Sequence, residues 1–506
     1  MASIMNVPLK KIREDVWEVP QSYKDYMRVP ARIYAAEGLL AKMKSDLTLR
    51  QTINVASLPG IEKYSLVMPD GHQGYGFPIG GVAATDFNDG VISPGGVGYD
   101  INCGVRLIRT NLKEEDVRPH LSDILDSLFE YIPAGLGLSG KVTLSFSRLD
   151  EVLRGGTEWC IENGYGWEED IAHTEEGGRL EVANPDKIDE KSKKRGAPQL
   201  GTLGSGNHFL EVQVVDDIFD EQLANAFGIE EKGQVTVLIH TGGRGFSHGV
   251  CSYYLRKFER EMNKDASLSK ILGLERELAC AYLNSDTGMD YFEAMCACAN
   301  YAFANRQLAT HWTRKVFEDV LRRKAEDMEI RLVYDIAHNI AKDEEHVVDG
   351  KRKNLCVHRK GATRAFPAGD ERLPPIYRNV GQPVLVPGSM GTRSFLAVGT
   401  EIAKEETFGS CAHGSGREMS RTAAMRQYRG EEVRDELAKR GILVKVRERS
   451  KRDVRKKRGI QFDKYGELAE EVSAAYKDPE AVIHSCELSG IARKVAAFRA
   501  IGVIKG

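Results

Sequence analysis

Histidine, cysteine and aspartate residues that could bind a metal ion stand in glycine-rich segments of this 506-residue chain. Three histidines lie at the ends of strand-like apolar runs: His240 ends one run, His338 follows another and His208 opens a third. Side chains at strand ends converge on sites that are built from loops. A single histidine in such a place is more often structural, but three of them together with Asp100 and Cys103 favour a metal centre.

The residue types of these ligands limit which metal ions the site could bind. A thiolate with imidazoles suits zinc, manganese, iron or cobalt, and the carboxylate of Asp100 is a hard ligand that favours manganese. One thiolate can bridge two ions, and a metal would deprotonate Cys103, because the pKa of a free cysteine is about 8.5. The sequence therefore predicts a metal site whose ligands must be gathered from distant segments.

Five glycine-rich segments each hold a residue that could bind a metal or move a proton. Glycine lets backbone amides approach a ligand closely, and strings of such amides bind phosphate oxygens. One such segment is weak support for a phosphate site, whereas five are difficult to explain as turns alone. The segments are Pro69–Gly76, Gly95–Gly104, Gly204–His208, His240–Gly245 and Cys411–Arg417.

Composition and charge are those of an ordinary globular protein, with 42% hydrophobic and 29% charged residues. The net charge is only −3, so a nucleic-acid site would have to be a local patch. No apolar run approaches the roughly 20 residues of a membrane span, and Met1–Arg13 lack the apolar core of a secretory signal. A cytoplasmic protein without a membrane partner is therefore expected. The nine scattered cysteines include no CxxC pair, which argues against a disulfide framework or a zinc ribbon.

The elements that must position the candidate ligands follow no regular alternation of strand and helix. Strand-like runs occur at Gly80–Ala84, Gln234–Ile239, Ile330–Ile336 and Pro383–Val386. Residues 250–328 have a helical pattern. This mixed order predicts an α+β fold rather than a Rossmann fold or a barrel.

Length alone suggests about three domains, but no linker divides the chain. We expect one large mixed domain over residues 1–506 with a helical insertion and a metal site at strand ends, although the first 50 or so residues carry little signal. Within the helical region, Cys280, Cys296 and Cys298 are expected to be small core residues.

Two basic clusters could contact an anionic partner. The stretch Arg447–Arg458 holds eight basic residues among twelve, which indicates either a solvated surface or a phosphate-binding arm. The second cluster, Lys191 with Lys193, Lys194 and Arg195, precedes a glycine-rich segment, and this position favours an anionic partner there.

Longer motifs resemble one family throughout the chain, from about Val55 to the C-terminus. Together they are similar to the RNA-splicing ligase RtcB family of 3′-phosphate RNA ligases, and none belongs to a common superfold. The motifs are SPGGVGYDINCGVR (Ser93–Arg106), QLGTLGSGNH (Gln199–His208), YDIAHNIAK (Tyr334–Lys342), HRKGATRAFP (His358–Pro367), GSMGTRS (Gly388–Ser394) and IGVIKG (Ile501–Gly506).

The resemblance implies two Mn²⁺ ions bridged by Cys103, with Asp100 and His208 on one ion and His240 and His338 on the other. It implies further that GTP is the nucleotide and that His413 becomes covalently guanylylated. Glu211 is the candidate for the guanine N1 and N2 donors, because a carboxylate can accept from both. The positions that correspond to nucleotide contacts are Asn207, Phe209, Glu211, Asn339, Ser389, Ser394 and Lys505, with Arg417 on either the nucleotide or an RNA phosphate.

RNA contacts are implied for Arg244 and for the cluster Lys193, Lys194 and Arg195. The implied substrates are tRNA halves or other cleaved RNA, and the resemblance also implies an activator protein, archease. The chain departs from the family pattern at Tyr476–Pro479, where Asp478 and Pro479 stand in place of Asn-Val.

The implied activity joins an RNA 3′-phosphate or 2′,3′-cyclic phosphate to a 5′-hydroxyl, in tRNA splicing and RNA repair. Two other classes of function were weighed. A dimetal phosphoesterase would share the metal ligands but would need neither His413 nor Lys505. A non-catalytic RNA-binding protein would account for the basic clusters but not for the five candidate metal ligands.

Overall fold

The apolar runs at the middle and the end of the sequence build an eight-stranded sheet in the computed structural model, which describes residues 7–135, 137–447 and 464–506. Neighbouring strands are antiparallel, apart from the parallel pair β18 and β19. The C-terminal strand lies inside the sheet, between β8 and β16. In spatial order the strands are β11 (Arg331–Ala337), β7 (Gly104–Lys113), β9 (Gln234–Thr241), β8 (Phe209–Ile218), β19 (Ala492–Lys505), β16 (Ser394–Gly399) and β15 (Pro383–Val386), with β18 (Leu443–Val446) beside β19.

Both faces of the middle of this sheet are buried, which explains the apolar residues that follow one another in β9. Successive side chains of a strand point to opposite faces. On β9, Val237 and Ile239 belong to one apolar cluster with residues of α10, whereas Leu238 belongs to another cluster on the opposite face.

A second sheet, of seven strands, holds the N-terminal region, for which the sequence carried little signal. The structure also has two two-stranded sheets among its described residues, β6 (Val91–Ile92) with β10 (Ala281–Tyr282) and β14 (Ala362–Arg364) with β17 (Ser410–Ala412). The seven strands are, in order, β1 (Lys10–Arg13), β2 (Val16–Val19), β3 (Ala31–Tyr34), β4 (Ile61–Tyr75), β5 (Phe77–Asp86), β13 (Lys351–Lys360) and β12 (Asn339–Val348).

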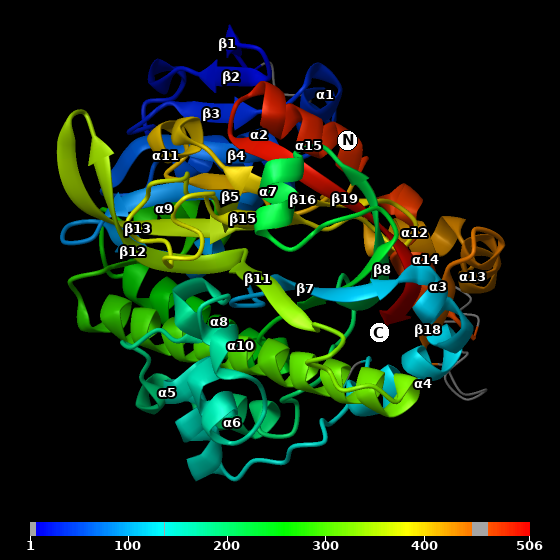
Figure 1. Ribbon diagram of the computed structural model, residues 1–506. Coiled ribbons are helices and arrows are strands. Elements are labelled where there is room, and N and C mark those ends of the chain that lie inside the picture. Colours follow the sequence, from blue (N-terminus) through cyan, green and yellow to red (C-terminus); the bar gives the residue numbers. More distant parts are fainter. Residues whose placement is uncertain (1–6, 136, 448–463) are drawn as a thin grey trace.

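Helices α5, α6, α8 and α10 gather on one side of the molecule (Figure 1). The longest is α10, which begins after the N-cap Ser285, whose side chain accepts from the Gly288 amide, and ends where Arg322 takes a left-handed conformation. The helices are α1 (Glu37–Ser45), α2 (Thr48–Val55), α3 (Glu114–Val117), α4 (Leu121–Tyr131), α5 (Phe146–Glu162), α6 (Glu190–Gly196), α7 (Glu221–Ala226), α8 (Arg244–Met262), α9 (Ser269–Leu274), α10 (Asp286–Leu321), α11 (Glu401–Glu406), α12 (Arg421–Gln427), α13 (Gly430–Lys439), α14 (Gly466–Glu470) and α15 (Pro479–Leu488).

The predicted helical region of residues 250–328 is confirmed at both ends but is wrong in the middle. Between α9 and α10 the chain leaves the helical conformation and forms β10, which pairs with β6. Cys296 and Cys298 are buried in α10 as expected. Cys280 is also buried, but it lies in the extended segment before β10 and its amide donates to the sulfur of Met262.

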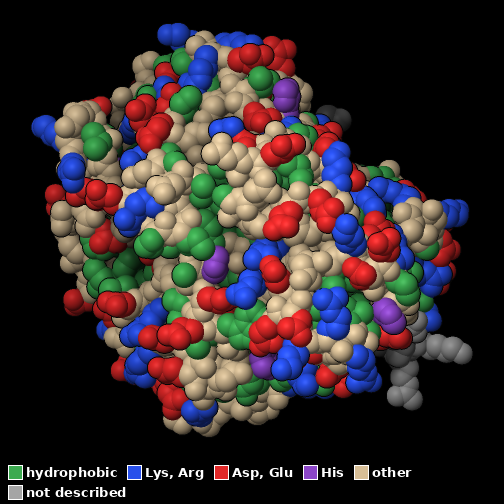
Figure 2. All heavy atoms as spheres, in the orientation of Figure 1, with side chains coloured by type: hydrophobic (Ala, Val, Ile, Leu, Met, Phe, Trp, Pro, Cys, Tyr) green, Lys and Arg blue, Asp and Glu red, His purple; other side chains and the backbone are tan. Residues whose placement is uncertain are grey.

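The chain forms one large mixed α+β domain, as expected from the absence of a linker. A single apolar cluster contains Val67 and Val82 of the seven-stranded sheet together with Leu153 of α5, Tyr254 of α8 and Tyr291 of α10. Because the sheet and the helices share this core, they are not separate units. Acidic and basic side chains are interspersed over the face that Figure 2 draws, in keeping with a net charge of −3.

No helix among the described residues is both long enough and apolar enough to cross a membrane. The basic stretch Arg447–Arg458 lies outside the described residues apart from Arg447, so its predicted role as a surface or an RNA-binding arm stays a prediction.

Candidate metal centre and nucleotide cavity

Four neighbouring strands of the eight-stranded sheet bring the predicted ligands together at one end of these strands. His240 lies in β9, opposite Val105 of β7 on one side and Phe209 of β8 on the other. Cys103 directly precedes β7, His208 directly precedes β8, and His338 directly follows β11. The amide of His338 also donates to the carbonyl of Cys103 over 2.9 Å. The strand register therefore places all four residues together.

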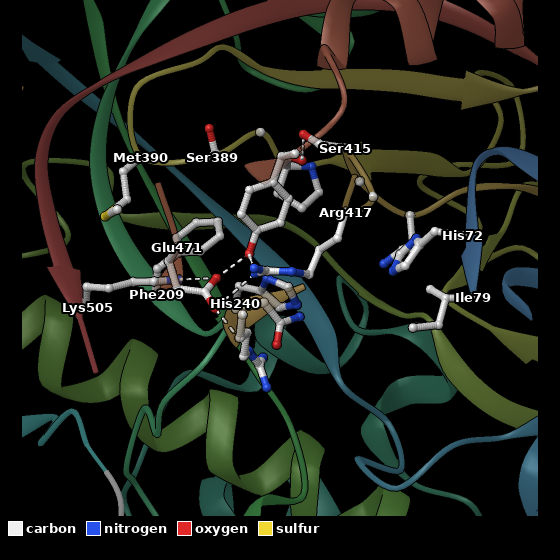
Figure 3. Close-up of a pocket in the computed structure, with 18 residues that line it drawn as sticks. His72, Ile79, Phe209, His240, Ser389, Met390, Ser415, Arg417, Glu471 and Lys505 are labelled. Atoms are coloured by element: carbon white, nitrogen blue, oxygen red, sulfur yellow. Dashed lines mark hydrogen bonds and ion pairs between the residues drawn. The ribbon is translucent and has the colours of Figure 1, made fainter. Parts of the chain in front are cut away.

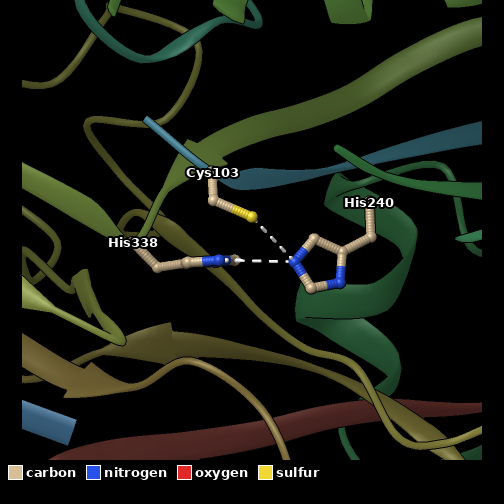
Figure 4. A group of neighbouring side chains, drawn as sticks. All are labelled: Cys103, His240 and His338. Atoms are coloured by element: carbon tan, nitrogen blue, oxygen red, sulfur yellow. Dashed lines mark hydrogen bonds between the residues drawn. The ribbon is translucent and has the colours of Figure 1, made fainter. Parts of the chain in front are cut away.

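The ligand atoms form two groups that share one sulfur. One group is Cys103, His240 and His338, and the other is Asp100, Cys103 and His208; within each group the ligand atoms lie within 4.8 Å of one another. The Sγ of Cys103 lies 3.3 Å from the Nε2 atoms of both His208 and His240. The Nε2 atoms of His240 and His338 are 3.3 Å apart, and Figure 4 shows these two histidines with Cys103. This is the arrangement in which one thiolate can serve two ions.

The protonation states suit metal ligands. Burial lowers the pKa values of His240 and His338 well below the ordinary value, so both are neutral imidazoles with a lone pair to give. The Nδ1 of His208 lies 3.0 Å from the carbonyl of Leu203, which leaves Nε2 as the ligand atom. Burial raises the pKa of the Cys103 thiol well above its ordinary value, so its thiolate needs a cation beside it.

Close backbone approach at the centre requires glycine. A Cβ at Gly242 would come within 2.7 Å of the Cα of Cys103 and 2.8 Å of both carboxylate oxygens of Asp100. A Cβ at Gly416, where φ is +70°, would come within 2.1 Å of the carbonyl oxygen of Asp70. The glycine-rich segments therefore let the ligand-bearing and histidine-bearing loops touch, in addition to exposing amides.

His413 directly follows β17 and belongs to neither ligand group. Its ring centroid lies 4.8 Å from that of His338, so it stands beside the centre. The carboxylate of Asp70, which is buried, accepts from the Nδ1 of His413 and, over 3.1 Å, from its backbone amide. Because Nδ1 is the donor in this contact, Nε2 keeps its lone pair and can act as a nucleophile.

The first cavity contains both His413 and His240 and is lined by the loop Gly414–Arg417. Figure 3 shows Lys505, Phe209 and Met390 at one end of this cavity and His72 and Ile79 at the other. The Nζ of Lys505 lies 5.5 Å from the centroid of the Phe209 ring and 3.6 Å from a carboxylate oxygen of Glu471. The end of the cavity at Lys505 and Phe209 is therefore aromatic and basic, and the end at His72 and Ile79 lies beyond His413.

The second cavity lies on the other side of the same centre and is larger, about 800 Å³ against about 160 Å³. It is lined by Asp100 and His208 from the metal centre and by the basic residues Arg195, Arg244 and Arg421. The two cavities share Asn207, Arg421 and Glu471 as lining residues. A molecule in either one would therefore reach the metal ligands.

Comparison with known proteins agrees with this geometry. The family model described as tRNA-splicing ligase RtcB matches residues 51–506. A protein of Thermococcus kodakarensis named tRNA-splicing ligase RtcB is 56% identical over 500 residues, which cover 99% of each chain. Proteins with the same name from Methanococcus maripaludis and Archaeoglobus fulgidus are each 52% identical, over 99% and 98% of this chain and 100% and 99% of their own lengths. The chain belongs to the tRNA-splicing ligase RtcB family.

The nucleotide positions that the RtcB resemblance implies fall into two sets in the structure. Five of the eight line the first cavity: Asn207, Phe209, Ser389, Arg417 and Lys505. The guanidinium of Arg417 is already held by Glu471, by the Tyr476 hydroxyl and by two backbone carbonyls.

The other three implied positions, Glu211, Asn339 and Ser394, are not among the lining residues of the first cavity. Asn339 joins two loops, because its side chain donates to the carbonyl of Asp100 and accepts from the amide of Gly361. Ser394 accepts from the amide of Gly388, which does line the cavity. Both residues therefore position the walls of the site.

Glu211 has an acceptor that no group in the described part of the chain uses. Its Oε2 accepts from the Nε2 of Gln213 over 2.7 Å, whereas its Oε1 is buried without a hydrogen-bond partner among these residues. Burial raises the pKa of Glu211 to about 7. A buried acceptor without a partner is costly, so this atom fits a ligand that brings hydrogen-bond donors.

The four basic residues for which the resemblance implies RNA contacts fall into two pairs in the structure. Arg195 and Arg244 line the second cavity. Lys193 instead forms an ion pair with Asp150 at 2.8 Å, and Lys194 forms one with Glu190 at 2.7 Å; neither is a lining residue of the second cavity.

Three residues of the site had no individual role in the sequence interpretation. Asp70 orients His413 although the two are 343 residues apart, and its only signal was its place in a glycine-rich segment. Glu471 and Tyr476 hold Arg417 between the two cavities. Nothing in the spacing of either residue could have indicated this, because their partner lies more than 50 positions away.

Proposed function

We propose that the protein is an RNA ligase that uses GTP and Mn²⁺ to join an RNA 3′-phosphate or 2′,3′-cyclic phosphate to a 5′-hydroxyl. Membership of the RtcB family supports ligation of tRNA ends. The observation that carries the proposal is the placement of His413 beside a centre with two ligand groups, with Nδ1 held by Asp70 and Nε2 left as a nucleophile. A dimetal phosphoesterase would use the two ligand groups but would not need a covalent histidine beside them.

The donor set fits two manganese ions, one held by Asp100 and His208 and the other by His240 and His338, with Cys103 common to both. Three imidazoles, one thiol and one carboxylate suit a divalent transition metal, and the hard carboxylate of Asp100 together with membership of the RtcB family favours manganese. When bound, the ions would neutralise phosphate charge and lower the pKa of a bound hydroxyl. His413 is not part of either group, so its lone pair remains available for the reaction.

The proposed chemistry has three transfers, and each forms one bond to phosphorus and breaks another. The Nε2 of His413 attacks the α-phosphorus of GTP, and pyrophosphate leaves. An oxygen of the RNA 3′-phosphate then attacks the same phosphorus, which frees His413 and leaves GMP on the RNA end. The 5′-hydroxyl finally attacks the RNA phosphorus, loses its proton and expels GMP. A cyclic phosphate first requires hydrolysis by water.

The residues around His413 suit the first transfer. The carboxylate of Asp70 stabilises the positive charge that the imidazole gains when Nε2 forms its bond to phosphorus. The loop Gly414–Arg417 lines the cavity in which the phosphates would lie. Phe209 and Lys505 line the opposite end, where a ring face and a cation would support guanine. Glu211 does not line the cavity, but its charge interacts with that of Lys505, so its unpaired acceptor would support guanine at the same end.

The test is incubation of the purified protein with α-labelled GTP and Mn²⁺. Label should be retained in alkali and lost in acid, as expected of a P–N bond, and peptide mapping should place it on His413. His413→Ala should take no label but should still join RNA that already carries a 3′-guanylylated end. Label on any other peptide, or undiminished labelling of His413→Ala, would remove the proposed nucleophile.

Tests of joining follow from the same proposal. RNA with a 3′-phosphate and RNA with a 5′-hydroxyl should be joined only when GTP and Mn²⁺ are both supplied, with tRNA halves among the substrates. A need for an archease activator stays a prediction, to be checked by adding that protein to the same assay. The cytoplasmic location also stays a prediction.

A further inference from the structure

A ridge of four side chains leads away from the metal centre along α8. Arg244, His248, Ser252 and Arg256 are spaced four residues apart, so they form one row on the helix surface. The row begins at the centre, because the amide of Arg244 donates to a carboxylate oxygen of Asp100 over 3.1 Å. Twelve residues of α-helix extend for about 18 Å, so the row ends well beyond the reacting groups.

Three hollows follow this ridge in sequence. Arg244 and His248 line the second cavity. Arg195 of α6 lines both that cavity and a smaller hollow, which also holds Ser252 and Arg256. Ser252 and Arg256 in turn line a third hollow. Each hollow shares lining residues with the next, so the three hollows adjoin one another along the ridge, and we refer to them together as the depression. Its first hollow, the second cavity, reaches the metal centre.

Three of the cations along this depression have no partner among the described residues, whereas Arg276 and Arg421 form ion pairs with Glu259 and Glu471. Within the described residues, no hydrogen bond or ion pair engages the side chains of Lys191, Arg195 or Arg256, and all three are exposed. The carboxylate of Asp189 in the same hollow is occupied, because it caps α6 through the amide and hydroxyl of Ser192. Lys194, one residue away on α6, has Glu190 as its partner. The smaller hollow therefore holds three cations that are unpaired within the described chain against one engaged carboxylate and is locally positive, whereas the second cavity and the third hollow also have acidic lining residues.

Aromatic rings line the opposite side of the depression. The rings of Tyr99 and His248 are stacked, with centroids 4.9 Å apart and planes at 13°, and Tyr75 meets Tyr99 edge-on at 5.3 Å. Tyr75 and Tyr99 share the third hollow with Arg256. Cations that follow a backbone together with rings that accept bases are the features by which proteins bind single-stranded nucleic acid.

We propose that this α8 track binds a single-stranded segment of the RNA substrate, a few nucleotides beyond the end that reacts. Phosphates would lie on Lys191, Arg195 and Arg256, and a base would stack on Tyr75 or Tyr99. The proposal rests on the proposed ligase function and extends it, because it predicts that the enzyme grips RNA at a distance from the join. Paired RNA would not offer free base faces to these rings.

The experiment compares two double variants of the full chain that lose the same charge. Lys191→Ala with Arg256→Ala removes two cations of the track. The control, Lys315→Ala with Arg323→Ala, removes two exposed cations that have their own partners, Asp319 and the carbonyl of Asp327. RNA affinity is measured over a range of salt concentrations, together with KM and kcat for joining. Labelling by α-labelled GTP is measured in parallel.

The track variant should bind single-stranded RNA more weakly, with a higher KM and the same kcat, and its labelling by GTP should be unchanged. Its salt dependence should flatten by about 1.4 in the slope of log K against log salt, because each phosphate contact contributes about 0.7 for single strands. Shortening the unpaired segment next to the join should weaken binding by the wild type but not by the track variant. Tyr75→Leu should weaken binding, while Tyr75→Phe should not, since stacking needs only the ring.

Equal salt slopes and equal KM values for the track variant and the control would overturn the α8 track and leave the ligase proposal standing. Failure of the wild type to take label from GTP or to join RNA would instead overturn the ligase proposal. Loss of labelling in the track variant alone would also overturn the track as an RNA site, because the change would then act on the centre itself.

Discussion

Exchange of Glu211 for glutamine tests the nucleotide end of the site with little change in shape. Glu211 is buried in β8, one carboxylate oxygen accepts from Gln213, and the other has no partner among the described residues. A carboxylate can accept from both N1 and the 2-amino group of guanine. Glutamine offers one acceptor and one donor, so its amide group would face one of the two guanine donors with another donor.

The magnitude follows from the number of hydrogen bonds lost. A hydrogen bond to a charged group is worth about 1.5–3 kcal/mol, which corresponds to about tenfold to 150-fold in affinity. Inosine triphosphate lacks the 2-amino group and isolates one of these bonds. The wild type should therefore favour GTP over inosine triphosphate by about that factor, and Glu211→Gln should bring the ratio close to one.

The assay is the concentration dependence of His413 labelling with each nucleotide, using wild type and Glu211→Gln. Manganese content and thermal stability of both proteins serve as controls for the centre and the fold. The reasoning is refuted if the variant keeps the wild-type ratio of GTP to inosine triphosphate. A loss of labelling with both nucleotides and a loss of metal would mean that Glu211 supports the centre rather than guanine.

The raised pKa of Glu211, about 7, predicts a pH dependence with a definite sign. The carboxylate is the form that accepts from guanine, so GTP affinity should rise with pH, by about tenfold between pH 6 and pH 8. The stability of the fold should change in the opposite direction. The pKa of Glu211 in the folded protein lies above its ordinary value of 4.5, so the free energy of unfolding should fall as the pH rises from about 4.5 through 7. Thermal unfolding over this pH range should show a smaller loss of stability for Glu211→Gln than for the wild type. An identical loss in both proteins would contradict the raised pKa of Glu211.

Three further substitutions probe the centre. Cys103→Ala should abolish labelling and joining, and metal analysis should find fewer than two ions per chain; two retained manganese ions would disprove the shared thiolate. Asp70→Asn should slow His413 labelling by about 10²- to 10⁴-fold with unchanged metal content, and normal labelling rates would mean that the contact is only structural. The guanidinium of Arg306 in α10 donates to the carbonyls of Asn102 and Thr241 and to Asp335. Arg306→Lys keeps the charge, but its single ammonium group cannot reach all of these acceptors. The substitution should therefore weaken binding of Mn²⁺ in calorimetry of the metal-free protein. Equal affinity in that titration would show that the centre does not depend on Arg306.

The sequence was informative about the ligands because strand ends, glycine and ligand chemistry are local signals. His208, His240 and His338 lie where the apolar runs placed them, and the strand predicted at Pro383–Val386 has these same bounds as β15. The interruption before α10 was missed, since β10 exists only through its pairing with β6.

Contacts across the chain were beyond the reach of sequence patterns. The order of the eight strands depends on register, and the place of β19 beside β8 was not predicted; resemblance implied only that Lys505 contacts the nucleotide. Periodicity likewise could not show that Asp70 meets His413, nor that Lys193 forms an ion pair with Asp150 of α5.

The long helix α10 is also part of the site, because Arg306 ties together the segments that carry the ligands. Its guanidinium donates to the carbonyls of Asn102 and Thr241, which adjoin Cys103 and His240, and to both oxygens of Asp335. Asp335 lies in β11, the strand that ends at His338.

These groups are completely buried, and Arg106 gives Asp335 a second cationic partner. A buried charge is tolerated only when its hydrogen bonds are satisfied, so each partner restrains the others. Asn102, with φ of 52°, adopts the left-handed conformation inside this network, and such strain persists only where the surroundings fix it. The ligand loops are therefore held in place by the protein itself, which explains how one sulfur can lie within reach of two ligand groups in the folded chain.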